Sequence, residues 1–188
     1  MNSLPANNPD WLVKKIIKMG GIISFYDFMN FVLNDPINGY YGSGKAKLGV
    51  RGDFVTSPSL SDDFAFLAGK QIEDWLIQFK NSFLSNQKLA VIEFGAGDGS
   101  FMSGLIKYFL ENNKNFLEGV SFVIIEPNEG MVEKQKNKLE DFLNLGIDIL
   151  WKGLEEVEEN NINGIVLANE VLDALPVERI TFSKGKLL

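Results

Sequence analysis

Two hydrophobic patterns alternate along the second half of the chain. Apolar runs of strand length recur at four places, namely Leu89–Phe94, Val120–Ile125, 146–151 and 162–168. Between them, residues 100–110 and 131–143 carry apolar side chains at helical spacing. Strands separated by helices favour parallel pairing with right-handed crossovers. The pattern therefore predicts an α/β fold built on a doubly wound, mainly parallel, Rossmann-like sheet.

The first part of the chain is patterned differently and predicts a helical and loop extension. A short helix is expected over residues 11–19, and Ser24 caps a second helix with one apolar face. Residues 35–52 combine several glycines with Tyr40-Tyr41, which is typical of a folded loop. These tyrosines either face a ligand or hold the loop on the domain. We predict two regions, 1–84 with helices and a glycine-rich loop and 85–188 as a Rossmann-like core.

Composition removes several classes of chemistry. The chain has no cysteine and no histidine, which excludes disulfides, thiolate or imidazole metal sites and histidine general bases. Its formal charge is −7 with scattered basic residues, which disfavours nucleic acid as a partner. The apolar runs are too short to span a bilayer, so no membrane partner is expected. The N-terminus has no secretory pattern and no arginine, and we therefore predict a cytoplasmic protein.

A glycine-rich turn follows the first predicted strand directly. Gly95, Gly97 and Gly99 allow a tight turn and let backbone amides approach a ligand at the carboxyl ends of the strands. The spacing lacks the third glycine of a dinucleotide fingerprint, and no P-loop lysine follows. Glu93 suits a cationic group, and Glu126 after the second strand suits a ribose diol. The alternative is a glycine-rich turn that binds nothing.

Two polar clusters have both a local and a functional interpretation. Asp53, Thr56 and Ser57 stand just before a long predicted helix, where they serve a ligand or tie a turn, and the local sequence favours the turn. Asn169 and Glu170 follow the fourth predicted strand. There they either face a substrate or form a helix cap and its first turn.

Taken together, these motifs resemble a known enzyme family. Glu93-x-Gly95-x-Gly97-x-Gly99 with Glu126 resembles the cofactor site of class I S-adenosylmethionine-dependent methyltransferases. A narrower resemblance, over residues 22–180, is to the MidA-like family, which includes the mitochondrial complex I assembly methyltransferase. It is carried by Asp35-Pro36-x-x-Gly39-Tyr40-Tyr41, Gly52-Asp53-Phe54-x-Thr56-Ser57-Pro58 and Asn169-Glu170-x-x-Asp173-Ala174-Leu175-Pro176.

The resemblance implies a role for each matched residue. The segment Gly95-Ala96-Gly97-x-Gly99 would line the methionine part of S-adenosyl-L-methionine, with Glu93 facing its ammonium group and Glu126 holding the ribose hydroxyls. Region 1–84 would act as a lid over cofactor and substrate, with Asp53, Thr56 and Ser57 in the pocket. Asn169, Glu170 and Asp173 would be the catalytic, substrate-facing groups.

The resemblance also implies a function, a methyltransferase that acts on a protein side chain, with arginine as the acceptor. Glu170 and Asp173 would localise the guanidinium charge and accept its proton, without a metal. The alternatives are a non-catalytic assembly module that retains the cofactor fold and a nucleotide-binding oxidoreductase, which Ser100 disfavours. The family continues well beyond the Asp173-Ala174-Leu175-Pro176 motif, so the chain is either the N-terminal portion of a longer product or a shortened homologue. We therefore expect an incomplete sheet whose uncovered edge invites self-association.

Overall fold

The four predicted strands form one parallel sheet. The computed structural model describes the chain except residues 1–8, 50, 54, 83–87, 158–162 and 188. The strand order is β3-β2-β1-β4, and every neighbouring pair is parallel. The strands are β1 (Leu89–Phe94), β2 (Val120–Ile125), β3 (Ile149–Lys152) and β4 (Gly164–Ala168). The predicted α/β fold is confirmed, and the bounds of β1 and β2 are those that the hydrophobic pattern indicated.

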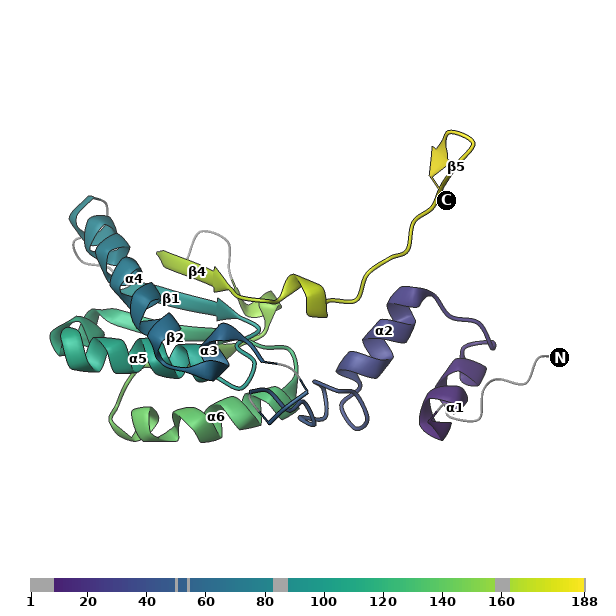
Figure 1. Ribbon diagram of the computed structural model, residues 1–188, viewed down its shortest axis with the longest axis horizontal. Coiled ribbons are helices and arrows are strands. Elements are labelled where there is room, and N and C mark those ends of the chain that lie inside the picture. The colour runs from purple at the N-terminus through teal and green to yellow at the C-terminus, as the bar shows by residue number, and fades with distance from the viewer. Residues whose placement is uncertain (1–8, 50, 54, 83–87, 158–162, 188) are drawn as a thin grey trace.

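Three helices cover one face of this sheet (Figure 1). They are α4 (Asp63–Ser82), α5 (Ser100–Asn112) and α6 (Glu129–Asn144), and their apolar faces share one core cluster with β1 and β2. Phe109 of α5 and Phe122 of β2 are fully buried there, with ring centroids 6.1 Å apart. Burying a side chain of this size contributes about 1.5–3 kcal/mol. Among the described residues, no helix has the length and the apolar composition that a membrane crossing requires.

The N-terminal helices lie beside the sheet (Figure 1). They are α1 (Asp10–Lys18) and α2 (Phe25–Asn34), and a single turn, α3 (Ser57–Leu60), follows the glycine-rich loop. Ser24 caps α2 as predicted, because its Oγ accepts a hydrogen bond of 3.0 Å from the Asp27 amide. Lys15 of α1 forms an ion pair of 2.8 Å with Asp35, which fixes α1 to the end of α2.

Helix α4 links the two predicted regions. It lies within residues 1–84, yet Ile72 and Leu76 are fully buried in the core cluster, where α4 packs on α5. The division at residue 84 stays a prediction. Helix α4 belongs to region 1–84 by sequence but packs into the core of region 85–188.

The chain beyond β4 leaves the core. A single 3-10 turn (Leu172–Ala174) is followed by an extended stretch and a small hairpin, β5 (Phe182–Ser183) with β6 (Lys186–Leu187). Lys184 and Gly185 form its turn with positive φ angles of 48° and 74°. Figure 1 shows this segment projecting away from the sheet.

We predict self-association through the outer edge of β4. This strand ends the sheet and pairs only with β1 among the described strands. An uncovered edge presents unpaired amides and carbonyls to another chain. Sedimentation equilibrium should show a mass that rises with protein concentration, and a monomer at every concentration would contradict this prediction.

Candidate functional site

A cavity of about 740 Å³ opens where the parallel strands end. Its walls come from the ends of β1, β2 and β4, the segment after β3, the glycine loop after β1 and the N-terminal loop. Its volume suits a nucleoside-sized ligand. Parallel strands place their carboxyl ends at one edge of a sheet, which is why segments distant in sequence converge here.

The glycine loop forms the floor of this cavity and is closely packed. Gly95, Gly97 and Gly99 all have positive φ angles, of 59°, 55° and 84°. A Cβ atom on Gly97 would lie 2.9 Å from Leu48 Cδ1, and one on Gly95 would lie 3.3 Å from Val171 Cγ2. The positive φ angles therefore favour glycine, and a Cβ atom on Gly95 or Gly97 would also push a neighbouring side chain aside. Gly95, Ala96 and Gly97 line the cavity, whereas Gly99 precedes α5 and faces α6.

Glu93 is a buried acid that lacks a partner. Its side chain is 3% exposed, it lines the cavity, and its Oε2 atom accepts no hydrogen bond from any described residue. Burial raises the pKa of Glu93 to about 8, with a further contribution from the charge of Asp98. A buried acid of this kind becomes ionised when a cation pairs with it. The position therefore fits a cationic ligand group.

Glu126 is held in one orientation at the end of β2. Its Oε1 accepts from the Asn128 amide at 3.0 Å, and its Oε2 accepts from Gln135 Nε2 at 3.1 Å. Burial raises the pKa of Glu126, and the hydrogen bonds from Asn128 and Gln135 lower it. Each oxygen keeps a further acceptor position, so the carboxylate suits a pair of ligand hydroxyls.

The two adjacent tyrosines have different environments. Tyr40 donates a hydrogen bond of 2.7 Å to Asp53 Oδ2, which holds the loop together. Tyr41 lines the cavity instead. Burial raises the pKa of the Tyr41 hydroxyl, and the charges of Asp173 and Glu126 raise it further. Tyr40 therefore helps to hold the loop, whereas Tyr41 is placed where it could face a ligand.

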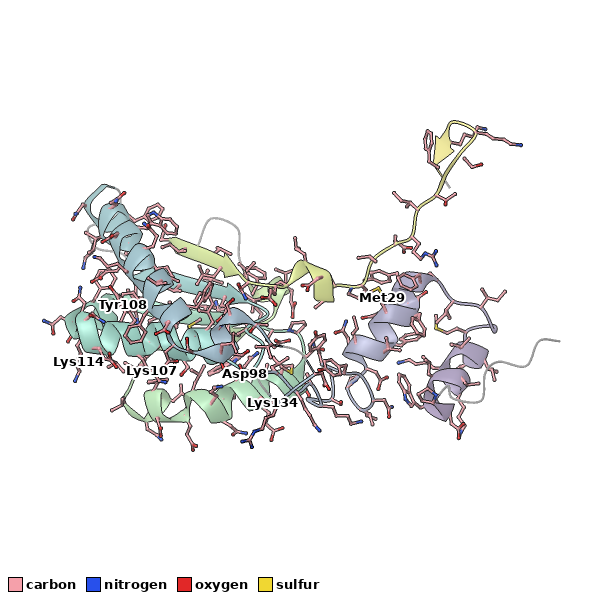
Figure 2. All side chains as sticks on the ribbon, viewed as in Figure 1. Met29, Asp98, Lys107, Tyr108, Lys114 and Lys134 are labelled. Atoms are coloured by element: carbon pink, nitrogen blue, oxygen red, sulfur yellow. The ribbon has the colours of Figure 1, made fainter. Side chains whose placement is uncertain are left out.

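The N-terminal loop is docked on the start of α6 through two glycines. A Cβ atom on Gly44 would lie 2.7 Å from the carbonyl oxygen of Gly130. Lys134, labelled in Figure 2, donates from its ammonium group to the carbonyl of Ala46. Because this contact lies between Tyr41 and Leu48 in sequence, it places both side chains at the cavity.

Gly130→Ala should displace this loop and weaken ligand binding about tenfold, since the added methyl would meet the backbone of Ser43 and Gly44. Gly119→Ala is the matched control, because a Cβ there meets only Lys80 Nζ at 3.9 Å. Calorimetric titration with S-adenosyl-homocysteine checks the prediction. Equal affinity of both variants would show that the loop contact does not shape the site.

The segment after β4 does not cap an α-helix. Asn169 and Glu170 line the cavity, and Glu170 has a φ angle of 52°. A left-handed conformation is uncommon outside glycine and is often found at functional sites. Only the 3-10 turn at Leu172–Ala174 follows, so the local interpretation of these residues as a helix cap does not hold. Asp173 is exposed, and its charge acts on Tyr41.

The structure brings most, but not all, of the predicted residues together. Those that line the cavity are Thr56, Glu93, Gly95, Ala96, Gly97, Glu126, Asn169 and Glu170. Asp53 instead pairs with Tyr40, and Ser57 is an exposed residue at the start of α3. Thr56 also ties the turn, because its amide donates to Ser59 Oγ at 3.0 Å. The locally favoured turn is therefore present, with Thr56 at the cavity as well.

Several site residues were not predicted from the sequence. Leu48, Val171 and the segment Gly153-Leu154-Glu155 line the cavity without a distinctive motif. Gln135 has a signal in the sequence. It interrupts the buried face formed by Met131, Leu139 and Phe142 of α6, where a polar side chain needs buried partners.

Comparison with known proteins places this geometry in a family. A family model described as "Putative S-adenosyl-L-methionine-dependent methyltransferase" matches residues 68–188. The zebrafish (Danio rerio) protein named Protein arginine methyltransferase NDUFAF7, mitochondrial, is 30% identical over 89% of this chain and 42% of its own length. The human protein of the same name is 28% identical over 93% of this chain and 43% of its own length. The chain thus spans less than half the length of these relatives.

A solved structure supports the same assignment. It is a candidate methyl transferase from Burkholderia thailandensis bound to S-adenosyl-homocysteine. It is 28% identical, with a TM-score of 0.67, and the match covers 99% of this chain and 52% of that one.

The comparison corrects the predicted location. The matching zebrafish, cattle and human proteins are all named as mitochondrial, so the cytoplasmic prediction is wrong. That prediction depended on the composition of the N-terminus, of which residues 1–8 lie outside the described part of the chain. Targeting segments are recognised by their own composition, and the fold carries no equivalent signal.

The residues of the cavity fit the cofactor of this family. S-adenosyl-L-methionine carries an ammonium group, a ribose diol and a bulky sulfonium centre. The unpartnered Glu93 oxygen, the oriented Glu126 carboxylate and the glycine floor are chemically suited to these three features. With a family model that matches well over half of its residues, the chain belongs to the S-adenosyl-L-methionine-dependent methyltransferases.

Proposed function

We propose that this chain binds S-adenosyl-L-methionine in the cavity and transfers its methyl group to a protein side chain, with arginine as the acceptor. The observation that carries the proposal is the buried Glu93 carboxyl, whose Oε2 has no hydrogen-bond partner among the described residues, beside a loop with three glycines at positive φ. Arginine as the acceptor is supported by the names of the relatives, which are called protein arginine methyltransferases.

Each cofactor-binding residue has a separate task in this proposal. Glu93 would pair with the ammonium group, and Gly95-Ala96-Gly97 would support the methionine part. Glu126 would accept hydrogen bonds from the ribose hydroxyls. When bound, the cofactor supplies an electrophilic methyl group on a sulfonium. Tyr41 and Leu48 in the docked loop help to exclude water from the cavity.

The acceptor side of the proposal depends on the residues after β4. A guanidinium has a pKa above 12 and is a poor nucleophile, so a methyltransferase has to localise its charge and remove a proton. Glu170 lines the cavity, and Asp173 lies close enough to act on Tyr41. These carboxylates would orient the guanidinium and accept the proton released on methylation. The net charge of −7 also favours a basic substrate segment.

Two measurements on the purified chain test the proposal. Calorimetric titration should show binding of S-adenosyl-homocysteine and no binding of NAD. Incubation with methyl-labelled S-adenosyl-L-methionine and an arginine-containing basic protein should transfer label to arginine. Cofactor binding without transfer would favour the non-catalytic assembly module, and binding of NAD alone would favour the oxidoreductase.

A further inference from the structure

Gln135 connects two parts of the cavity wall, the glycine loop and Glu126, to Trp151 of β3. Its side chain is fully buried, and its amide nitrogen donates to Gly97 O at 2.9 Å and to Glu126 Oε2 at 3.1 Å. Its amide oxygen accepts from Trp151 Nε1 at 3.0 Å. One side chain of α6 thereby joins the glycine loop, the end of β2 and the end of β3. We infer that Gln135 is a positioning residue that sets the Glu126 carboxylate for the ribose of the cofactor.

The chemistry of the three partners requires an amide at this position. Trp151 Nε1 is only a donor, whereas the Gly97 carbonyl and the Glu126 carboxylate are acceptors. An amide supplies one acceptor and two donor hydrogens, which match this set. A glutamate at this position would place an oxygen against two acceptors, and an apolar residue would leave buried polar groups unpaired. The amide orientation is therefore determined by its surroundings.

The consequence for Glu126 is a carboxylate held at both oxygens. Asn128 fixes Oε1 through its backbone, and Gln135 fixes Oε2 through a side chain that cannot rotate without losing the other two bonds. Trp151 packs against the core cluster, which secures the far end of this chain of hydrogen bonds. When one carboxylate binds both hydroxyls of a diol, both of its oxygens have to point at the ligand. Fixing them before the ligand binds lowers the entropy cost of binding.

The inference rests on the proposed cofactor site and is tested by binding alone. The probes are S-adenosyl-homocysteine and its 2′,3′-dideoxy analogue, titrated calorimetrically into wild type, Gln135→Met and Glu126→Gln. Glu140→Gln, on the exposed face of α6, is the matched control. Circular dichroism shows whether each variant is folded. Gln135→Met has a side chain of similar size, and Gln135→Asn is a shorter amide that serves as a second variant.

Wild type and Glu140→Gln should prefer S-adenosyl-homocysteine over the dideoxy analogue by about tenfold or more. In Gln135→Met and in Glu126→Gln this preference should shrink to about threefold or less. A double variant that carries both substitutions should show little further loss of preference. A variant that loses affinity for both ligands by the same factor would overturn the inference, because only a general structural role would then remain. Failure of wild type to bind either ligand would overturn the proposed function and the inference together.

Discussion

Glu93→Gln should weaken cofactor binding and abolish its dependence on pH. With the pKa of Glu93 near 8, the free protein carries this carboxyl mostly protonated at neutral pH. A bound ammonium group stabilises the ionised form, so binding should release close to one proton at about pH 7. Affinity should therefore rise by up to about tenfold per pH unit between about pH 5.5 and 7.5. The amide of the variant holds no proton to release.

Calorimetry in two buffers of different ionisation enthalpy measures this proton release directly. Glu111→Gln, an exposed position at the end of α5, is the control and should release the same number of protons as wild type. Equal proton release by wild type and Glu93→Gln would mean that Glu93 is not the group that pairs with the ligand.

The raised pKa of Glu93 also determines whether the folding stability of the protein rises or falls with pH. The folded protein keeps a proton on Glu93 up to about pH 8, whereas the unfolded chain loses it near the ordinary value of 4.5. The folded state therefore binds more protons in this window, and its stability falls as pH rises, by at most about 1.4 kcal/mol per unit. The Glu93→Gln variant lacks this contribution, so it should be the more stable protein near pH 7.5 in denaturant titrations.

Glu170→Gln should abolish methyl transfer and leave cofactor binding intact. The carboxylate is proposed to orient the acceptor and take its proton, which contributes on the order of 10²–10⁴ in rate. Glutamine has nearly the same size and the same cost at the φ angle of 52°, so the backbone after β4 should not change. Label transfer and S-adenosyl-homocysteine affinity are measured on the same preparation.

Glu178→Gln, in the exposed stretch beyond the cavity, is the control and should retain both properties. A Glu170→Gln variant that loses binding and transfer equally would contradict the division of roles between the cofactor-binding residues and the residues after β4.

The core of this fold was predictable because its signals are local. Continuous apolar runs defined β1 and β2, and Ser24 marked the start of α2 through a hydrogen bond to a residue three positions away. Glu93 and the glycines were predictable because strand, turn and helix follow one another directly in sequence.

The remaining features of the site depend on contacts between distant segments. The packing of Gly44 on Gly130 brings Tyr41 to the cavity, and Gln135 finds its partners on three different elements. The helix-cap interpretation of Asn169 failed because the chain turns through a left-handed Glu170 instead of entering a helix. A single sequence shows that Gln135 lies on a buried helix face and needs partners, but it contains no local signal for which segments supply those partners.

The most direct test of this account is a crystal structure of the chain grown with S-adenosyl-homocysteine. The account predicts the ligand over residues 95–99, with its amino group against Glu93 and its ribose hydroxyls on Glu126. A ligand bound at another place, or one seated there with both carboxylates turned away from it, would contradict the account.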